Sequence, residues 1–545
     1  FDQTRQIIEH GVFHIDPYRY YTADLIAYEK PNGKTHYYPN KAPGTSLLAV
    51  APMAFWMRVV KPFGLADHLY WHVVAYLTIL STVALLSALA AVAVFAVLRR
   101  LTGSVAWPAL AVIAVWLGTI GFPFSTLFFS HQQAAAQLVI AFHFLFKLRW
   151  EGPGRLRWQA ARMTLAGFLC GFTLATEYPA LLLVGLLCAY FAYTLFFSEI
   201  AVRQRLVLGA AFAGGLILGG LILVGYNLAA FGKVFFVPYS AYAQAGDQSS
   251  FPGHRAGYVG VHWPGIREFI RVLGEITIRP QRGLLYIGIE NGRVYACSPV
   301  LWLALPGFVW LFLKKRARPE TVLIAAMTVA YFTFNACYGD SIVYWGGAWS
   351  VGPRHLVALL PFLAIPLVEG ARRLWFLFVP LLLIGVFYML LATAVEPRVP
   401  YEYPNPARDL FLENYLHGNL ALNRLGLFDP QERPIAGDST AFNAGWLLGL
   451  PGRWQLAPLM VWWLIIGSGM IASAAPGKTW DGMASRPGSQ NKTRDSERHE
   501  AAKYAEEQPG AAVLHKKELH KNDVAPDVSR GTGSMKNEKR TMKNG

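Results

Sequence analysis

Long apolar runs separated by short polar connections dominate the chain from residue 69 to residue 475. Runs of about 18 residues or more can cross roughly 30 Å of hydrocarbon as a helix. The pattern therefore predicts an all-α, polytopic integral membrane protein with about eleven visible transmembrane helices. The predicted spans are residues 69–98, 105–122, 126–147, 161–176, 178–197, 206–230, 296–313, 320–337, 355–370, 373–394 and 455–474.

Two regions flank this predicted transmembrane domain of residues 69–475. Residues 1–68 are polar and aromatic, and their short, Pro-interrupted apolar stretch 45–61 predicts a helix lying flat at the interface. Residues 476–545 lack an apolar period and predict a disordered tail. Because the chain begins at Phe1 in polar sequence, we expect a preceding piece that includes one helix.

The basic residues predict the topology. If residues 45–61 lie flat, every predicted inside connection carries at least two Lys or Arg, as the positive-inside rule requires. If residues 45–61 spanned the membrane, the inside and outside assignments of all later connections would be exchanged, and the rule would fail. We therefore expect a cytoplasmic tail and a multi-pass protein of the bacterial inner membrane. The large outside segments are then residues 1–68, 231–295 and 395–454, and residues 338–354 form a further outside loop.

Composition excludes several other classes. The chain is 54% hydrophobic and only 15% charged, which does not fit an ordinary cytosolic enzyme. The net charge of +16 comes mostly from Lys and Arg in short clusters between apolar runs, where they set the membrane topology. We therefore expect membrane lipids and no nucleic acid as partners. The four cysteines form no ligand pattern, and HExxH, DxD, P-loop and Rossmann signatures are missing where they would function. We expect no cofactor; a divalent metal is possible but not evident.

Several polar residues stand at predicted outside boundaries. Lys41 follows Tyr38 and can meet a lipid phosphate as a point charge, or act as an interfacial anchor. Glu177 interrupts an apolar stretch, which marks either a functional carboxylate or a simple turn before Pro179. His131 opens a span with two glutamines, as a sugar ligand or as part of a helix cap. Asp340 stands near Trp345, and this cluster, with Trp349 stacking on the ring, can bind acceptor sugar.

Four strings resemble the GT-C membrane glycosyltransferases, most closely the branch with protein O-mannosyltransferases, ArnT-type aminoarabinose transferases of lipid A, and RgtA/B/C/D-like bacterial proteins. Asp2-Gln3-Thr4-Arg5 resembles the family's Asp-Glu-x-Arg-like string at the exit of a first span, with Gln3 where Glu is common. Lys41-Ala42-Pro43-Gly44 resembles a Lys-Pro-Pro-like motif between two interfacial helices. The weaker similarities are Arg282-Gly283-Leu284-Leu285 and the stretch from Trp345 to His355.

The resemblance implies transfer of a sugar from a polyprenyl-phosphate donor to a glycan, lipid or protein acceptor, usually with inversion. It implies Asp2 as general base, although Asp2 can equally cap the first interfacial helix. Lys41, Arg282 and Arg354 are the implied phosphate ligands, with His355 as a further donor. For Arg282, Arg354 and His355 the alternatives are a turn residue, an interfacial anchor and a helix-end hydrogen bond.

Other functions stay open. A flippase or transporter of lipid-linked sugars predicts two related halves with charges at the midplane, which the chain does not show clearly. An O-antigen polymerase or ligase-like enzyme predicts a large late outside loop, and residues 395–454 are compatible with it. A noncatalytic GT-C relative is a further alternative.

Overall fold

The computed structural model describes residues 1–20, 22, 24–152, 154–197, 199–241, 252–254, 257–280, 282–344, 346–347, 349–400, 403–421 and 443–474. The predicted tail of residues 476–545 lies outside them. The chain divides into two units, Phe1–Leu464 and Ile465–Gly545.

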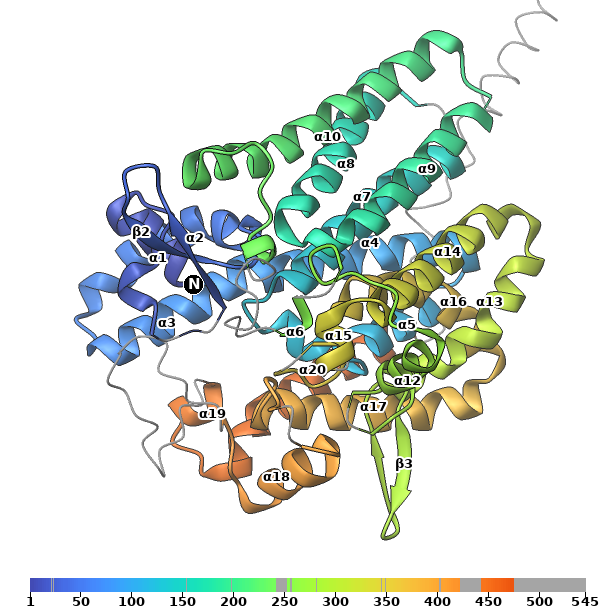
Figure 1. Cartoon of the computed structure of the whole chain (residues 1–545). Helices are drawn as coiled ribbons and strands as arrows, with labels where there is room; N and C mark the ends of the chain where they lie inside the picture. The colour runs from blue at the N-terminus through green and yellow to red at the C-terminus, as the bar shows by residue number, and fades with distance from the viewer. Residues whose placement is uncertain are drawn as a thin grey trace, which may run out of the picture. The chain divides into compact units, whose positions relative to one another are not determined.

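The first segment combines two helices with a hairpin, shown in dark blue in Figure 1. It runs α1 (Asp2–His10), η1 (Asp16–Tyr18), β1 (Leu25–Glu29), β2 (Thr35–Pro39) and α2 (Gly44–Val60). The strands pair antiparallel with Leu25 opposite Pro39. Their turn contains Gly33 at φ 77°, a left-handed conformation that glycine adopts without a Cβ clash. Residues 41–44 lie between α1 and the body of α2, in the order that the sequence resemblance implies. The hairpin that precedes them was not predicted.

Each of the eleven predicted spans contains a helix, so the prediction of an all-α polytopic architecture is confirmed. The first is one continuous apolar helix of three parts, α3, η3 and α4, with a π-helical turn in its middle. The helices of the spans are α3 (Asp67–Ile79), η3 (Leu80–Ala84), α4 (Leu85–Thr102), α5 (Ala106–Leu117), α7 (Ser130–Glu151), α8 (Leu156–Thr176), α9 (Leu181–Phe197), α10 (Val202–Phe231), α13 (Ala304–Leu313), α14 (Arg318–Ala336), α16 (Leu360–Arg373), α17 (Trp375–Val395) and α20 (Ala457–Ala474).

Six helical stretches of the described chain are long and apolar enough to cross a membrane. One of them joins α2 to η2 (Lys61–Phe63), the stretch that the charge pattern assigned to the membrane surface. Its mean hydropathy of 1.2 is the lowest of the six. Length and composition therefore allow α2 to span, and its flat placement stays a prediction. The other five are Leu69–Thr102, Tyr178–Phe197, Val202–Phe231, Arg354–Arg373 and Trp375–Val395.

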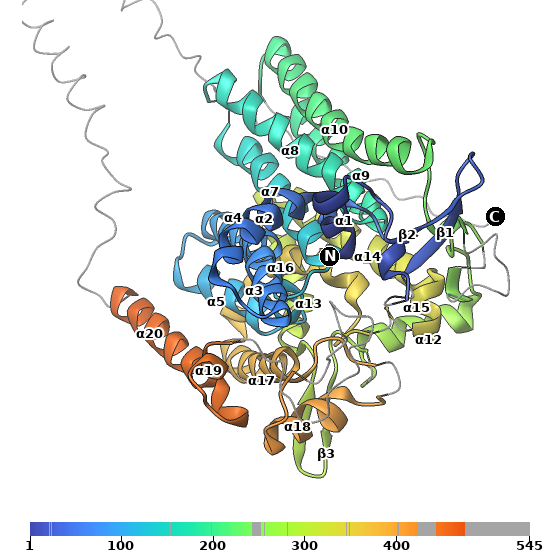
Figure 2. The same cartoon turned by 90° about the vertical axis from the view of Figure 1, so that its left-hand side faces the viewer.

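Glycines bring α8 and α10 into close contact, and the two helices run side by side in Figures 1 and 2. A Cβ at Gly215 of α10 would overlap the backbone oxygen of Thr164, and one at Gly219 would overlap that of Phe168. Gly167 and Gly171 of α8 face α10 in the same way. Small residues spaced by four let helix backbones approach in lipid, where packing rather than water exclusion drives association. These glycines therefore set the distance between the two helices.

Helix α16 forms the centre of the core, and it holds the polar groups at its first end in place. Residues 355–371 are all buried, and the helix packs against α4, α5, α7 and α13. A short 3-10 turn, η9 (Arg354–Leu359), leads into it. Because this helix is enclosed, Arg354 and His355 have a fixed position at its entrance.

The large segments predicted outside carry short elements. Residues 231–295 contain η6 (Pro252–His254), α12 (Ile266–Thr277) and the hairpin of β3 (Ile287–Glu290) with β4 (Arg293–Ala296), and neither hairpin of the chain was predicted. The remaining short elements are η4 (Tyr178–Ala180), α6 (Gly121–Ser125), η7 (Pro299–Leu303), η8 (Lys315–Ala317), α15 (Gly339–Tyr344), η10 (Ala407–Leu412), α18 (Glu413–His417), α19 (Ala444–Leu447) and η11 (Gly452–Leu456).

A fully buried carboxylate in the first turn of α14 connects three helices. Glu320 Oε1 accepts hydrogen bonds from Arg149 Nη1 at 2.7 Å, from Trp150 Nε1 at 2.9 Å and from Tyr190 Oη at 2.6 Å. A buried charge is tolerated when it is paired and hydrogen-bonded in this way. The network therefore fastens α7, α9 and α14.

Candidate functional site

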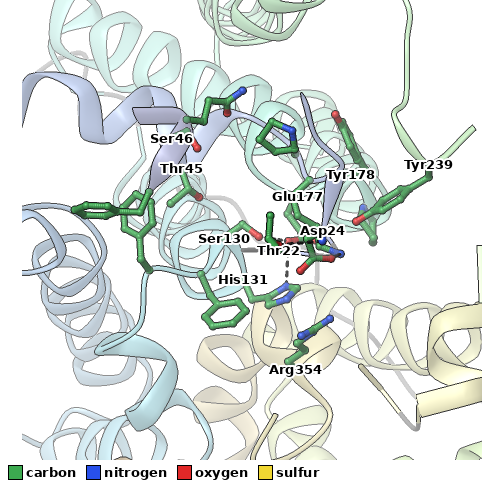
Figure 3. A pocket seen from close by; sticks show the side chains of 18 of the residues that line it. Thr22, Asp24, Thr45, Ser46, Ser130, His131, Glu177, Tyr178, Tyr239 and Arg354 are labelled. Carbon is green, nitrogen blue, oxygen red and sulfur yellow. Dashed lines mark hydrogen bonds and ion pairs between the residues drawn. The ribbon is translucent and has the colours of Figure 1, made fainter. Parts of the chain in front are cut away.

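A polar cavity of about 260 Å³ lies where segments far apart in the sequence meet. Its walls come from the start of α1, the connections flanking the β1–β2 hairpin, the start of α7, the turn after α8, and the entrance of α16. Figure 3 shows Asp24, Glu177, His131 and Arg354 facing this space. Its charged and imidazole side chains are Asp2, Asp24, Lys41, His131, Glu177, Arg354 and His355.

The hairpin brings Lys41 and Asp24 together. The register of Leu25 opposite Pro39 places the residue before β1 beside the residues after β2, and Lys41 Nζ lies 3.3 Å from Asp24 Oδ1. Burial raises the pKa of Asp24, but the charges of Lys41 and Arg354 outweigh it and hold that pKa below its usual value. The two side chains are still 38% and 48% exposed, so a ligand can reach this pair.

Arg354 and His355 share Asp340 behind the opposite wall. Arg354 Nη2 lies 3.9 Å and His355 Nε2 3.3 Å from Asp340 Oδ2. Burial raises the pKa of Asp340, but the His355 contact and the Arg354 charge together bring it well below its usual range. An ionised Asp340 is therefore in position to orient both side chains toward the cavity.

Glu177 is held by the start of α7. It stands in extended conformation between α8 and η4, so the predicted break in the apolar stretch is confirmed. Its Oε2 accepts a 2.5 Å hydrogen bond from Ser130 Oγ and lies 3.0 Å from His131 Nδ1, the pair marked in Figure 3. Burial raises the pKa of Glu177, but His131 and Ser130 lower it to about 2. Glu177 is therefore ionised, and its carboxylate already contacts Ser130 and His131.

Asp2 differs from the other carboxylates of the cavity. It is the first residue of α1, Phe1 is the cap residue, and no side-chain cap bond forms, so the expected capping role is not seen. Within the described part of the chain, the Asp2 carboxylate makes no hydrogen bond and no ion pair. Burial raises the pKa of Asp2 against the opposing charges of the amino terminus and Arg5. The pKa of Asp2 is therefore shifted in the opposite direction from those of Asp24, Glu177 and Asp340.

The structure brings together six of the ten residues expected in the site: Asp2, Lys41, His131, Glu177, Arg354 and His355 line the cavity, and Asp340 supports it from behind. Tyr38 instead packs among Ile26, Tyr226 and Phe231. Arg282 is buried elsewhere and donates to the backbone oxygens of Val399 and Pro400. Trp345 lies outside the described residues.

Sequence reasoning missed Asp24 and Tyr239. The signal for Asp24 was the Asn32-Gly33 turn between two short β-prone runs, which indicates a hairpin and places Asp24 beside Lys41. Tyr239, whose ring lies 5.2 Å from Lys41 Nζ, comes from the 231–295 segment, and no local pattern marks it. Among described residues, a group of three possible metal ligands, His14, Asp16 and His36, lies outside the lining of the cavity.

No protein-family model and no curated protein matches the chain. Two solved structures of ArnT from Cupriavidus metallidurans are similar to it. The one bound to undecaprenyl phosphate is 14% identical with a TM-score of 0.43, and the alignment covers 72% of this chain and 58% of that one. The apo structure is 15% identical with a TM-score of 0.41, covering 76% and 62%.

The chain thus spans less than two thirds of the length of either ArnT structure. The helices and the cavity described above do not depend on this similarity. Together they make the chain an all-α polytopic membrane protein with a charged cavity among its polar segments.

Proposed function

We propose that the protein is a membrane glycosyltransferase of the GT-C type. It moves a sugar from a polyprenyl-phosphate donor to an acceptor hydroxyl on a glycan, lipid or protein, with inversion at the anomeric carbon. The observation that carries the proposal is the presence of a candidate base and two cations in the same cavity. One carboxylate with a raised pKa, Asp2, shares the space with two cations, Lys41 and Arg354.

The proposed reaction needs both kinds of group. The acceptor oxygen forms a bond to the anomeric carbon while the bond from that carbon to the phosphate oxygen breaks. Asp2 takes the proton of the acceptor hydroxyl as general base. Lys41 and Arg354 stabilise the negative charge that grows on the leaving lipid phosphate. Water later removes the proton from Asp2, and the lipid phosphate leaves as product.

The supporting carboxylates fit the same scheme. Asp24, Glu177 and Asp340 each face a cation or an imidazole, and the pKa of each is lowered. Carboxyl groups whose environments push their pKa values apart take different roles at one pH. Asp2 therefore acts as base, while the other three position Lys41, His131, Arg354 and His355. Glu177 and His131 also offer hydrogen bonds to sugar hydroxyls.

The positive-inside pattern favours the outer face of the bacterial inner membrane, and we propose that the cavity lies there. The cavity adjoins the ends of α7 and α8, and Phe128 and Phe129 provide apolar lining beside the polar groups. A polyprenyl chain in the bilayer and a phosphate in the cavity fit such a boundary. No soluble nucleotide-sugar donor is needed in this scheme.

A transfer assay tests the proposal. Purified protein receives radiolabelled polyprenyl-phosphate sugars together with a membrane extract that supplies acceptors, and the label is followed by chromatography. We expect label in a new product and free polyprenyl phosphate in equal amount. Label that stays on the lipid but crosses the bilayer of proteoliposomes would contradict transfer and favour the flippase. Elongated lipid-linked chains, with the glycan moved as a block, would favour the polymerase or ligase.

Replacing Lys41 by methionine should weaken binding of polyprenyl phosphate by about tenfold or more, because a charge-assisted hydrogen bond contributes roughly 1.5–3 kcal/mol. Binding is measured by titration into detergent-solubilised protein. Lys34→Met is the matched control, since Lys34 is exposed in the turn of the same hairpin. Equal affinities of the two variants would remove Lys41 from the phosphate site.

A further inference from the structure

Three side chains of the first segment converge on one point beside the cavity. One oxygen of Asp16, Oδ2, lies 2.7 Å from His36 Nδ1 and 3.1 Å from His14 Nδ1. The two imidazole rings stack with centroids 4.3 Å apart and an interplanar angle of 27°. One ligand atom from each residue falls within 4.8 Å of the others.

His14 makes this cluster unusual. Its Nδ1 is shielded from solvent and makes no hydrogen bond, although it points to within 3.1 Å of the Asp16 carboxylate. A shielded polar atom without a hydrogen bond costs about 1–3 kcal/mol, so proteins seldom leave one without a reason. A metal ion accepts the lone pair of a neutral imidazole and would satisfy this nitrogen directly.

The Asp16 carboxylate is already oriented for such a role. Its second oxygen, Oδ1, accepts a hydrogen bond of 2.7 Å from the backbone nitrogen of Tyr37 in β2. This bond leaves Oδ2 turned toward the two imidazoles. Ligands of metal sites are held by outer hydrogen bonds of this kind. The three side chains are also about a quarter exposed, at 24%, 28% and 23%, so ions from solution can reach them.

We propose that His14, Asp16 and His36 bind a divalent transition-metal ion, with Zn²⁺ as the best fit. Two imidazoles and one carboxylate are typical zinc ligands, at about 2.0–2.2 Å from the ion. Around a tetrahedral ion, ligand atoms lie about 3.3 Å apart. The distances of 2.7 and 3.1 Å from Asp16 Oδ2 therefore need to widen by about 0.6 and 0.2 Å. Water takes the fourth position.

The proposed metal ion would hold together the segments that form one wall of the cavity. It joins the loop after α1 to η1 and to β2, and it thereby fixes the hairpin that carries Asp24 and Lys41 at its base. Ile15, between two of the ligands, lines the cavity itself. The ion is structural in this role, and the proposal does not depend on the proposed sugar transfer.

Metal content tests the proposal. Purified protein is stripped with a chelator, dialysed against Zn²⁺ and then against buffer, and measured by mass spectrometry of the metal. We expect about one zinc per chain in the wild type, and at least a tenfold loss in His14→Gln and His36→Gln. His10→Gln is the matched control, an exposed histidine of the same segment. Equal zinc in all four proteins, or none in the folded wild type, would overturn the site.

A second variant separates loss of metal from loss of folding. Cobalt replaces zinc and reports its ligands by visible and near-ultraviolet absorption. His36→Cys keeps a metal ligand, so we expect it to retain one Co²⁺ and to gain a thiolate-to-cobalt charge-transfer band that the wild type lacks. A folded His36→Cys protein, with wild-type elution in size exclusion, that binds Co²⁺ without this band would show that the ion lies elsewhere.

Discussion

Replacing Asp2 by asparagine is expected to lower the rate of sugar transfer by about 10²- to 10⁴-fold, the usual contribution of a positioned general base. The amide has nearly the same shape but cannot take the acceptor proton. Donor binding should stay within about twofold of wild type, because Lys41 and Arg354 are unchanged. The rate is measured with radiolabelled polyprenyl-phosphate sugar, and donor affinity by titration in detergent.

Asp67→Asn serves as the control for this experiment, because Asp67 is an exposed carboxylate at the start of α3. It should transfer sugar at the wild-type rate. If Asp2→Asn also does so, the base is another group, and Asp24→Asn would identify the nearest alternative. Loss of donor binding together with loss of transfer would instead assign Asp2 to the donor site.

The pH dependence of sugar transfer is an independent test of Asp2 as the general base. A base works in its deprotonated form, so transfer must fall as the pH drops through the pKa of the base. Burial raises the pKa of Asp2 above its usual 3.8, whereas the pKa of Glu177 is lowered to about 2. The acid limb of kcat/KM should therefore lie above pH 3.8 and be absent from the residual activity of Asp2→Asn. A limb near pH 2 would point to Glu177.

The second large effect concerns stability. Gly215→Ala adds one methyl group where α10 meets the backbone oxygen of Thr164 in α8. A backbone atom cannot turn aside as a side chain can, so the helices must separate along their whole contact. Overpacking commonly costs about 1–3 kcal/mol, and occasionally more. We expect a clear fall in the temperature of thermal unfolding and in the yield of monodisperse protein.

Gly214→Ala is the matched control, since a Cβ at Gly214 meets nothing within 4 Å. Alanine also favours helix over glycine by about 1 kcal/mol, so this neighbour should be neutral or slightly stabilised in detergent. The opposite signs of two adjacent, chemically identical substitutions isolate the contact with α8. Equal behaviour would mean that the two helices do not pack through Gly215.

The apolar pattern was sufficient to predict the helices, because each span depends on its own composition. It could not predict the hairpins, whose strands are only four or five residues long. Strands this short contain too few positions for an alternating pattern to stand out. Nor does composition reveal that α16 is enclosed while α10 is largely not, since both are simply apolar.

The candidate site was predicted best where a residue stood out from its surroundings. Glu177 interrupts an apolar run, and Arg354 opens one, so both were visible in the sequence and both line the cavity. Tyr38 and Arg282 were also conspicuous in the sequence, but neither lines the cavity. Tyr38 packs in an aromatic cluster, and Arg282 donates to the backbone oxygens of Val399 and Pro400. In a two-residue period, Pro39 and Tyr38 point to opposite faces of β2, and it is Pro39 that lines the cavity while Tyr38 enters the aromatic core.

The ion pairs around the cavity also bear on how the protein is made. Two of the three lowered-pKa carboxylates have a partner nearby in the sequence, Asp24 with Lys41 and Asp340 with His355, whereas Glu177 pairs with His131 at the start of α7. Since the chain emerges amino end first, the Asp24–Lys41 and His131–Glu177 pairs are both synthesised before Asp340, Arg354 and His355. Arg354 and His355 are the last residues in the sequence that line the cavity, so the complete cavity forms only after the segment that opens α16 has been synthesised.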